Sequence, residues 1–216
     1  MTPDGFNPLE LPADCGVMIL PGLPLLPKSM VPLYIFEPRY RKMLAASLAG
    51  DRMFAIAAWE PGDGPAIGGL GIVRACVGNP DGTSQLVLQG IARVRFDQWI
   101  DGSYPRASIS HVPEMEFSRP LSLELMEEIL SCIDSMAGGS EDATREILTL
   151  QSRALAATTE PSEFSDFAAA TFVADAGIRM ALLEENNATR RLEILAAWLN
   201  RQLADPLPPG AQAGGQ

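Results

Sequence analysis

The sequence predicts an α+β protein, in which a small wrapped antiparallel β-domain with one helix is followed by an α-helical bundle. In the first half, short apolar runs alternate with turn residues at intervals typical of a closed or wrapped sheet. In the second half, apolar residues recur at helical spacing instead. We therefore expect a β-rich domain over residues 1–116, a helical bundle over residues 117–204 and a disordered, Pro/Gly-rich tail over residues 205–216.

The elements of the first half follow from strand and turn signals. Strands are expected over residues 17–20, 30–36, 53–59, 71–77, 84–96 and 106–112. A helix is expected over residues 37–49, because Pro38 suits a first helical position and Gly50 suits a C-terminal cap. Gly90 interrupts the longest strand and predicts a bulge or a bend there.

The second half reads as successive helices. One helical face carries Leu123, Met126, Ile129, Leu130 and Ile133 and ends at Gly138 and Gly139. A second helix is expected to turn Ile147, Leu148 and Leu155 inward. A third helix starts at Pro161, a further helical pattern runs up to Asn186, and a last helix places Leu192, Leu195 and Leu199 on one face.

Charge and cysteine content narrow the class of protein. The net charge is −11, and residues 117–216 hold 7 arginines against 15 acids. A nucleic-acid partner or an anionic membrane surface is therefore not expected, since both need a cationic face. Three widely spaced cysteines suit a reducing compartment, and the first residues lack the basic start and apolar run of a signal peptide. We expect a cytoplasmic protein.

The stretch from Leu20 to Tyr40 is the most informative part of the chain. It contains Leu23-Pro24-Leu25, Pro27 and Val31-Pro32-Leu33, and it ends in the string Phe36-Glu37-Pro38-Arg39-Tyr40. This pattern resembles the start of the amino-terminal, substrate-binding domain of Lon-type ATP-dependent proteases. The similarity continues through Gly71-Ile72-Val73, Asp81-Gly82 and the run from Leu88 to Arg95. It implies a PUA-like pseudo-barrel followed by a helical bundle, in a non-catalytic module that recognises protein chains.

The residues that catalysis would need are sparse. The single histidine, His111, lies at a predicted strand end, and no Gly-x-x-x-x-Gly-Lys string, Cys-x-x-Cys motif or histidine pair occurs. Lys28 and Ser29 are not expected to form a catalytic Ser/Lys pair, because neighbouring residues on an extended chain point to opposite faces. We expect no catalytic residue, no metal and no cofactor, and a recognition module without the ATPase and peptidase domains of the Lon proteases.

Candidate binding residues come from the aromatic motif and from nearby strands. They are Phe36, Glu37, Arg39, Tyr40, Trp59, Arg93 and Arg95. For Phe36 and Tyr40, burial in the core is the favoured interpretation, with Glu37 and Arg39 bonded to backbone or to each other, and the border of an apolar groove is the alternative. Arg93 and Arg95 are interpreted first as exposed strand residues and second as groove-lining ones. The proline-rich entry over residues 22–27 and the loop over residues 59–69 are further candidate surfaces, with Trp59 either a surface anchor or a buried strand end.

The favoured hypothesis is a protein that binds unfolded or partly folded polypeptide segments. The alternatives are an RNA-binding PUA-like protein, a regulatory subunit that docks on a separate ATP-dependent protease, and an enzyme with a cryptic site around His111.

Overall fold

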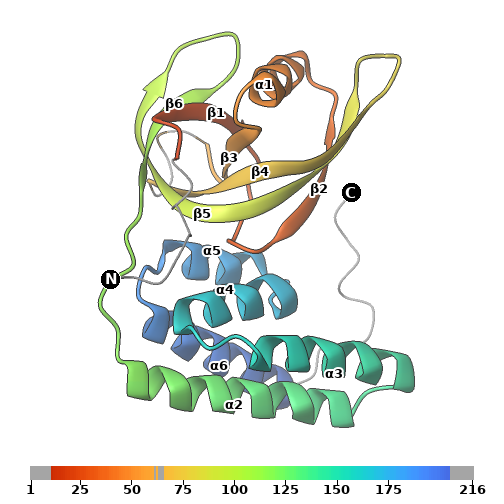
Figure 1. Ribbon diagram of the computed structural model, residues 1–216, viewed down its shortest axis with the longest axis vertical. Helices are drawn as coiled ribbons and strands as arrows, with labels where there is room; N and C mark the ends of the chain where they lie inside the picture. The colour runs from red at the N-terminus through yellow and green to blue at the C-terminus, as the bar shows by residue number, and fades with distance from the viewer. Residues whose placement is uncertain (1–10, 61, 63–65, 205–216) are drawn as a thin grey trace, which may run out of the picture.

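A computed structural model describes residues 11–60, 62 and 66–204. It has a six-stranded sheet and six helices, which confirms the α+β class expected from the sequence. In Figure 1, α1 (Pro38–Ala49) covers one side of the sheet and the other five helices form a bundle below it. The predicted tail over residues 205–216 lies outside the described residues.

The sheet closes on itself through its longest strand. The strands are β1 (Asp14–Ile19), β2 (Met30–Ile35), β3 (Met53–Ala57), β4 (Ile67–Gly78), β5 (Ser84–Ile100) and β6 (Arg106–His111). Their order is β2-β5-β4-β3-β1-β6, and β5 also pairs with β6. The first part of β5 pairs with β2 and its last part with β6, so five strands form a barrel and β2 extends it as an edge strand. All pairs are antiparallel except β1–β3.

The helical bundle packs directly against the barrel, and its core includes Leu26 and Ile67. Its helices are α2 (Arg119–Gly138), α3 (Asp142–Ala156), α4 (Pro161–Phe172), α5 (Ala176–Glu184) and α6 (Ala188–Ala204). Prolines occupy the first turn of α1, α2 and α4, where the missing backbone N–H breaks no intrahelical bond. Ile147 departs from the sequence expectation, because it points to solvent while Leu155 is buried.

The proline-rich segment before β2 joins the two halves. Pro24 to Pro27 are buried; Leu25 packs in the barrel core and Leu26 in the bundle core. Its backbone passes so close to the sheet that a Cβ on Gly69 or Gly90 would lie 2.0 Å from the Leu25 or Leu26 carbonyl oxygen. The expectation that residues 22–27 form a binding surface is therefore wrong for Pro24 to Pro27, since apolar side chains here fill the space between two cores.

Gly90 also marks the expected irregularity of β5. Leu70 pairs with Ala92 and Gly71 with Gly90, so Ile91 has no partner of its own. An extra residue of this kind is a β-bulge, and it lets the long strand bend from β2 toward β6.

Candidate functional site

Three adjacent strands present an apolar face to solvent. Along β2, Val31, Leu33 and Ile35 pack with the barrel core beneath α1, so the alternate residues point the opposite way. We call that opposite side the outer face. Its residues are Met30, Pro32, Tyr34 and Phe36 at β2, Gln85 and Val87 on β5, and Ala75 and Val77 on β4.

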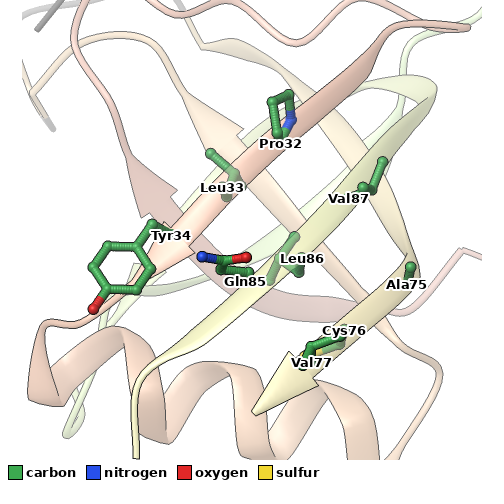
Figure 2. A pocket seen from close by; sticks show the side chains of 9 residues that line it. All are labelled: Pro32, Leu33, Tyr34, Ala75, Cys76, Val77, Gln85, Leu86 and Val87. Atoms are coloured by element: carbon green, nitrogen blue, oxygen red, sulfur yellow. The ribbon is translucent and has the colours of Figure 1, made fainter. Parts of the chain in front are cut away.

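The register aligns these side chains in rows across the strands. Gln85 pairs with Tyr34 on one side and with Val77 on the other. Val87 pairs likewise with Pro32 and Ala75. Figure 2 shows the rows side by side around a shallow groove of about 420 Å³. The lining is mostly apolar, and its polar side-chain groups are the Gln85 amide, the Tyr34 hydroxyl and the Cys76 thiol.

The outer face is unusually exposed for its composition. Tyr34, Phe36 and Val77 keep 50%, 59% and 65% of their surface accessible, and none of them enters a core cluster. The Tyr34 and Phe36 rings stack with centroids 5.8 Å apart. Contiguous exposed apolar surface of this kind marks interaction sites in soluble proteins.

The edge of β2 is less suited to binding than its face. Pro32 has no backbone N–H, and proline is tolerated there because an edge strand is paired on one side only. A peptide adding to this edge as a further strand would lose a hydrogen bond at Pro32. The arrangement therefore favours side-chain contacts in the groove over strand addition.

The aromatic motif divides between the core and the surface. Tyr40 is buried, and its hydroxyl accepts a hydrogen bond from the Ile19 backbone N–H at 3.2 Å. Arg39 donates to the exposed Glu37 carboxylate at 3.0 Å, as expected. Phe36 is exposed, so its interpretation as a core anchor is wrong: the chain turns into α1 directly after it and leaves its ring beside Tyr34. Of the five motif residues, only Phe36 joins the outer face.

Trp59 lies elsewhere in the barrel. It is half-buried, and its ring meets Phe96 edge-on at 6.0 Å. Phe96 stacks in turn on Trp99 at 5.4 Å. These rings pack against a second cluster of buried barrel residues, which includes Val17, Leu70 and Val94. That cluster contains no outer-face residue. The structure thus favours the strand-end interpretation of Trp59 over the surface-anchor one.

Arg93 is not the exposed strand residue that the sequence suggested. It is buried, and its guanidinium makes a two-pronged ion pair with Asp166 of α4, at 2.6 and 3.0 Å. It also donates to the backbone carbonyls of Leu182 and Leu183 at the end of α5. Sequence periodicity missed this role because the partners lie about 70 to 90 residues away. Arg95 is exposed as expected and pairs with Asp97 at 3.0 Å.

The surroundings of His111 give little support to an active site. A hollow of about 180 Å³ brings His111 near Arg93, Asp166 and Glu114. However, Arg93 and Asp166 bind each other, and Glu114 pairs with Arg191 at 3.1 Å. The charged groups there are therefore engaged in joining the barrel to the bundle.

The cysteines and the carboxylates show no reactive arrangement in the described ranges. Burial raises the pKa of the Cys15 thiol to about 12 and also raises the pKa of Cys132. Over residues 11–60, 62 and 66–204, no three His, Cys, Asp or Glu side chains gather in a way that could hold a metal ion. None of the described helices has the length and hydropathy needed to span a membrane.

The fold defines a class: a barrel-like sheet packed on a helical bundle, with an exposed apolar face on the sheet. The family model described as the ATP-dependent protease La (LON) substrate-binding domain matches residues 15–201. The chain belongs to this family, which confirms the resemblance drawn from the Leu20–Tyr40 stretch.

Individual relatives agree with this assignment. A Lon protease of Desulfosudis oleivorans is 25% identical over 205 residues, which are 90% of this chain and 24% of that protein. Lon protease 1 of Thermus thermophilus is 24% identical over 209 residues, covering 92% of this chain and 25% of that protein. The chain thus spans about a quarter of the length of the curated relatives it matches.

Solved structures establish the same fold. The N-terminal domain of Lon protease from Mycobacterium avium complex superposes with a TM-score of 0.66 and 22% identity, covering 90% of this chain and 100% of that one. A Lon N-terminal domain protein from Xanthomonas campestris gives a TM-score of 0.57 and 20% identity, covering 86% and 98%.

Sequence reasoning missed most of the outer face. Pro32, Tyr34 and Val77 are absent from the candidate binding residues, although the period of two along residues 30–36 is present in the sequence. Every residue of that strand is apolar, so the pattern could not tell which side faces the core. The assignment needs the position of α1, which only the folded chain supplies.

Proposed function

We propose that this chain binds unfolded or partly folded polypeptide segments, with the outer face as its contact surface. The observation that carries the proposal is the exposure of Tyr34 and Phe36 at β2 and of Val77 on β4, on the same face as Gln85 and the half-buried Val87 of β5. Tyr34, Phe36 and Val77 would lose solvent contact when an apolar segment lies in the groove, and this burial is the driving force. The description of the matching family as a substrate-binding domain points the same way.

The chemistry of the groove suggests which segments fit. Aliphatic and aromatic surface predominates, and Gln85 supplies an amide able to donate and accept. Such a groove suits extended segments that expose apolar side chains on one side, with little dependence on sequence. Folded proteins bury those side chains, so they would bind poorly.

We further propose that recognition is the whole contribution of these residues. ATP hydrolysis and peptide cleavage would then belong to other domains or to a separate ATP-dependent protease. The absence of a Gly-x-x-x-x-Gly-Lys string from the 216 residues supports this division of labour. The free thiols of Cys15, Cys76 and Cys132 suit a cytoplasmic setting.

A binding experiment with surface variants tests the proposal. A fluorescent, permanently unfolded client protein is titrated with the full chain, and a dissociation constant on the order of 100 µM is expected for one shallow apolar groove. Replacing Tyr34 and Val77 together by Glu should weaken binding at least about tenfold, because it places charge in an apolar contact. Leu123→Glu on α2 is the matched control, since Leu123 is also an exposed apolar residue but lies on the bundle.

The results separate the candidate functions. Equal affinity of the double variant and the control would contradict the outer face as the binding surface. Absence of client binding together with salt-dependent binding of an RNA oligonucleotide would favour the RNA-binding alternative instead.

A further inference from the structure

Helix α3 carries a second apolar surface that is unrelated to the outer face. Ile147 and Leu150 keep 56% and 59% of their surface exposed, and Ala143 and Ala154 continue the same stripe. The spacing of these four residues alternates between four and three, as in the seam of a coiled coil. The opposite side of α3 holds Ser152 and Leu155 against the bundle, so the stripe points outward. We call these four residues the α3 seam.

The residues beside the seam carry opposite charges at matching positions. Glu146 precedes Ile147, and Arg153 follows two helical turns later, about 10.5 Å farther along the axis. Both are exposed, and neither side chain makes a hydrogen bond or an ion pair within residues 11–60, 62 and 66–204. By contrast, Arg145 on the same helix binds Asp142 at 2.9 Å.

We propose that two copies of this chain associate through the α3 seam, with their α3 helices antiparallel. In that arrangement Ile147 of one copy meets Leu150 of the other, and each Ala143 meets an Ala154. A two-fold axis then brings Glu146 of each copy to Arg153 of the other, which makes two equivalent ion pairs. A parallel pairing would instead set Glu146 against Gln151, which is neutral. The charge pattern therefore selects a second, antiparallel copy as the occupant.

The association should be weak and readily reversible. One pair of 15-residue helices buries less than the roughly 800 Å² per partner of a standard stable interface. The net charge of −11 on each copy also opposes their approach. We expect a dimer with a dissociation constant on the order of 100 µM. The outer faces stay free in this dimer, so it would present two polypeptide-binding grooves at once.

Sedimentation equilibrium of the full chain over a range of concentrations tests the proposal. The wild-type chain should pass from monomer to dimer, and Ile147→Glu should raise the dissociation constant at least about tenfold. Leu123→Glu should leave it unchanged, because Leu123 is also an exposed apolar residue but lies on α2. Circular dichroism checks that each variant keeps its helix content, which is expected because all the changed side chains are exposed.

Charge reversal tests the orientation. Glu146→Arg and Arg153→Glu should each weaken the dimer about threefold, and the double variant should restore it. A chain that stays monomeric at millimolar concentration would overturn the proposal, as would a dimer that Ile147→Glu leaves intact. A dimer that survives Ile147→Glu but is lost on Tyr34→Glu would assign self-association to the outer face. Single reversals without effect would overturn the antiparallel arrangement.

Discussion

The guanidinium of Arg93 on β5 donates two hydrogen bonds to the carboxylate of Asp166 on α4, at 2.6 and 3.0 Å. Both side chains are buried at the junction of barrel and bundle. Arg191 of α6 approaches the same carboxylate at 3.6 Å and also holds Glu114 at 3.1 Å. This network fixes the position of the bundle beneath the sheet, and its arginines satisfy backbone carbonyls near the end of α5.

Removing the Arg93 side chain should destabilise the fold strongly. In Arg93→Met the buried Asp166 carboxylate keeps only Arg191 as a nearby positive charge. The backbone carbonyls of Leu182 and Leu183 also lose the hydrogen-bond donor that Arg93 supplies. Breaking one side of a buried ion pair costs about 3–5 kcal/mol, and we expect the lower end because Arg191 remains nearby. Urea denaturation followed by circular dichroism measures the change.

Arg95→Met is the control on the same strand. Arg95 is exposed, and its pair with Asp97 lies in water, so the expected change stays below about 1 kcal/mol. Similar losses for the two variants would show that the Arg93 network does not hold the halves together.

Gly90 should tolerate no side chain. A Cβ there would lie 2.0 Å from the carbonyl oxygen of Leu26, which is backbone in a buried segment and cannot move aside cheaply. Gly90→Ala should therefore lower the free energy of unfolding by at least about 2 kcal/mol. Thermal denaturation reports the loss.

Gly78→Ala provides the comparison, since a Cβ at the end of β4 meets nothing within 4 Å. Its expected effect is within about 0.5 kcal/mol of zero. If Gly90→Ala proved as stable as Gly78→Ala, the close passage of the proline-rich segment against the sheet would be refuted.

Removing the two aromatic side chains at the ends of the Phe36–Tyr40 motif should have very different effects on the free energy of unfolding. Tyr40→Ala empties a buried site and removes the acceptor of the Ile19 N–H, so we expect a loss of about 3–5 kcal/mol. Phe36→Ala removes an exposed ring and should cost less than about 1 kcal/mol. Chemical denaturation of the two variants side by side measures both losses. Comparable losses would show that Phe36 is packed in the core, against its exposed position here.

Cys15 should be inert in the folded chain and should make stability fall at high pH. Burial raises its pKa from the ordinary value of 9.0 to about 12, so the folded state holds the thiol proton more tightly than the unfolded state. This contribution to stability is complete below about pH 9 and is lost as the pH rises toward about 12, at up to about 1.4 kcal/mol per pH unit.

Comparison with Cys15→Ala isolates that contribution, because the other groups titrate alike in both proteins. The wild-type chain should lose stability faster than the variant between about pH 9 and pH 11. Alkylation followed by mass spectrometry should label Cys15 only after unfolding. Fast labelling of Cys15 in the native chain at neutral pH would contradict its buried position.

The sequence predicted the elements better than it predicted what they contact. Strand and helix signals are local, so the strand after the proline-rich stretch, the helix after Pro38 and the bulge at Gly90 were all foreseeable. Burial of Arg93 was not, because its partners come from α4 and α5. Exposure of Phe36 was not either, since aromatic residues usually fill cores. Ile147 shows the same limit: helical spacing gives a stripe, and only packing decides which stripe faces inward.

The central claim is that unfolded polypeptides bind the outer face, and residue-resolved NMR tests it most directly. Amide chemical shifts of the labelled full chain are followed while an unfolded client is added. The account predicts that the changing signals cluster at residues 30–36, 75–77 and 85–87. Changes confined to the hollow around His111, or to the α3 seam, with the β2–β5–β4 signals unmoved, would contradict it.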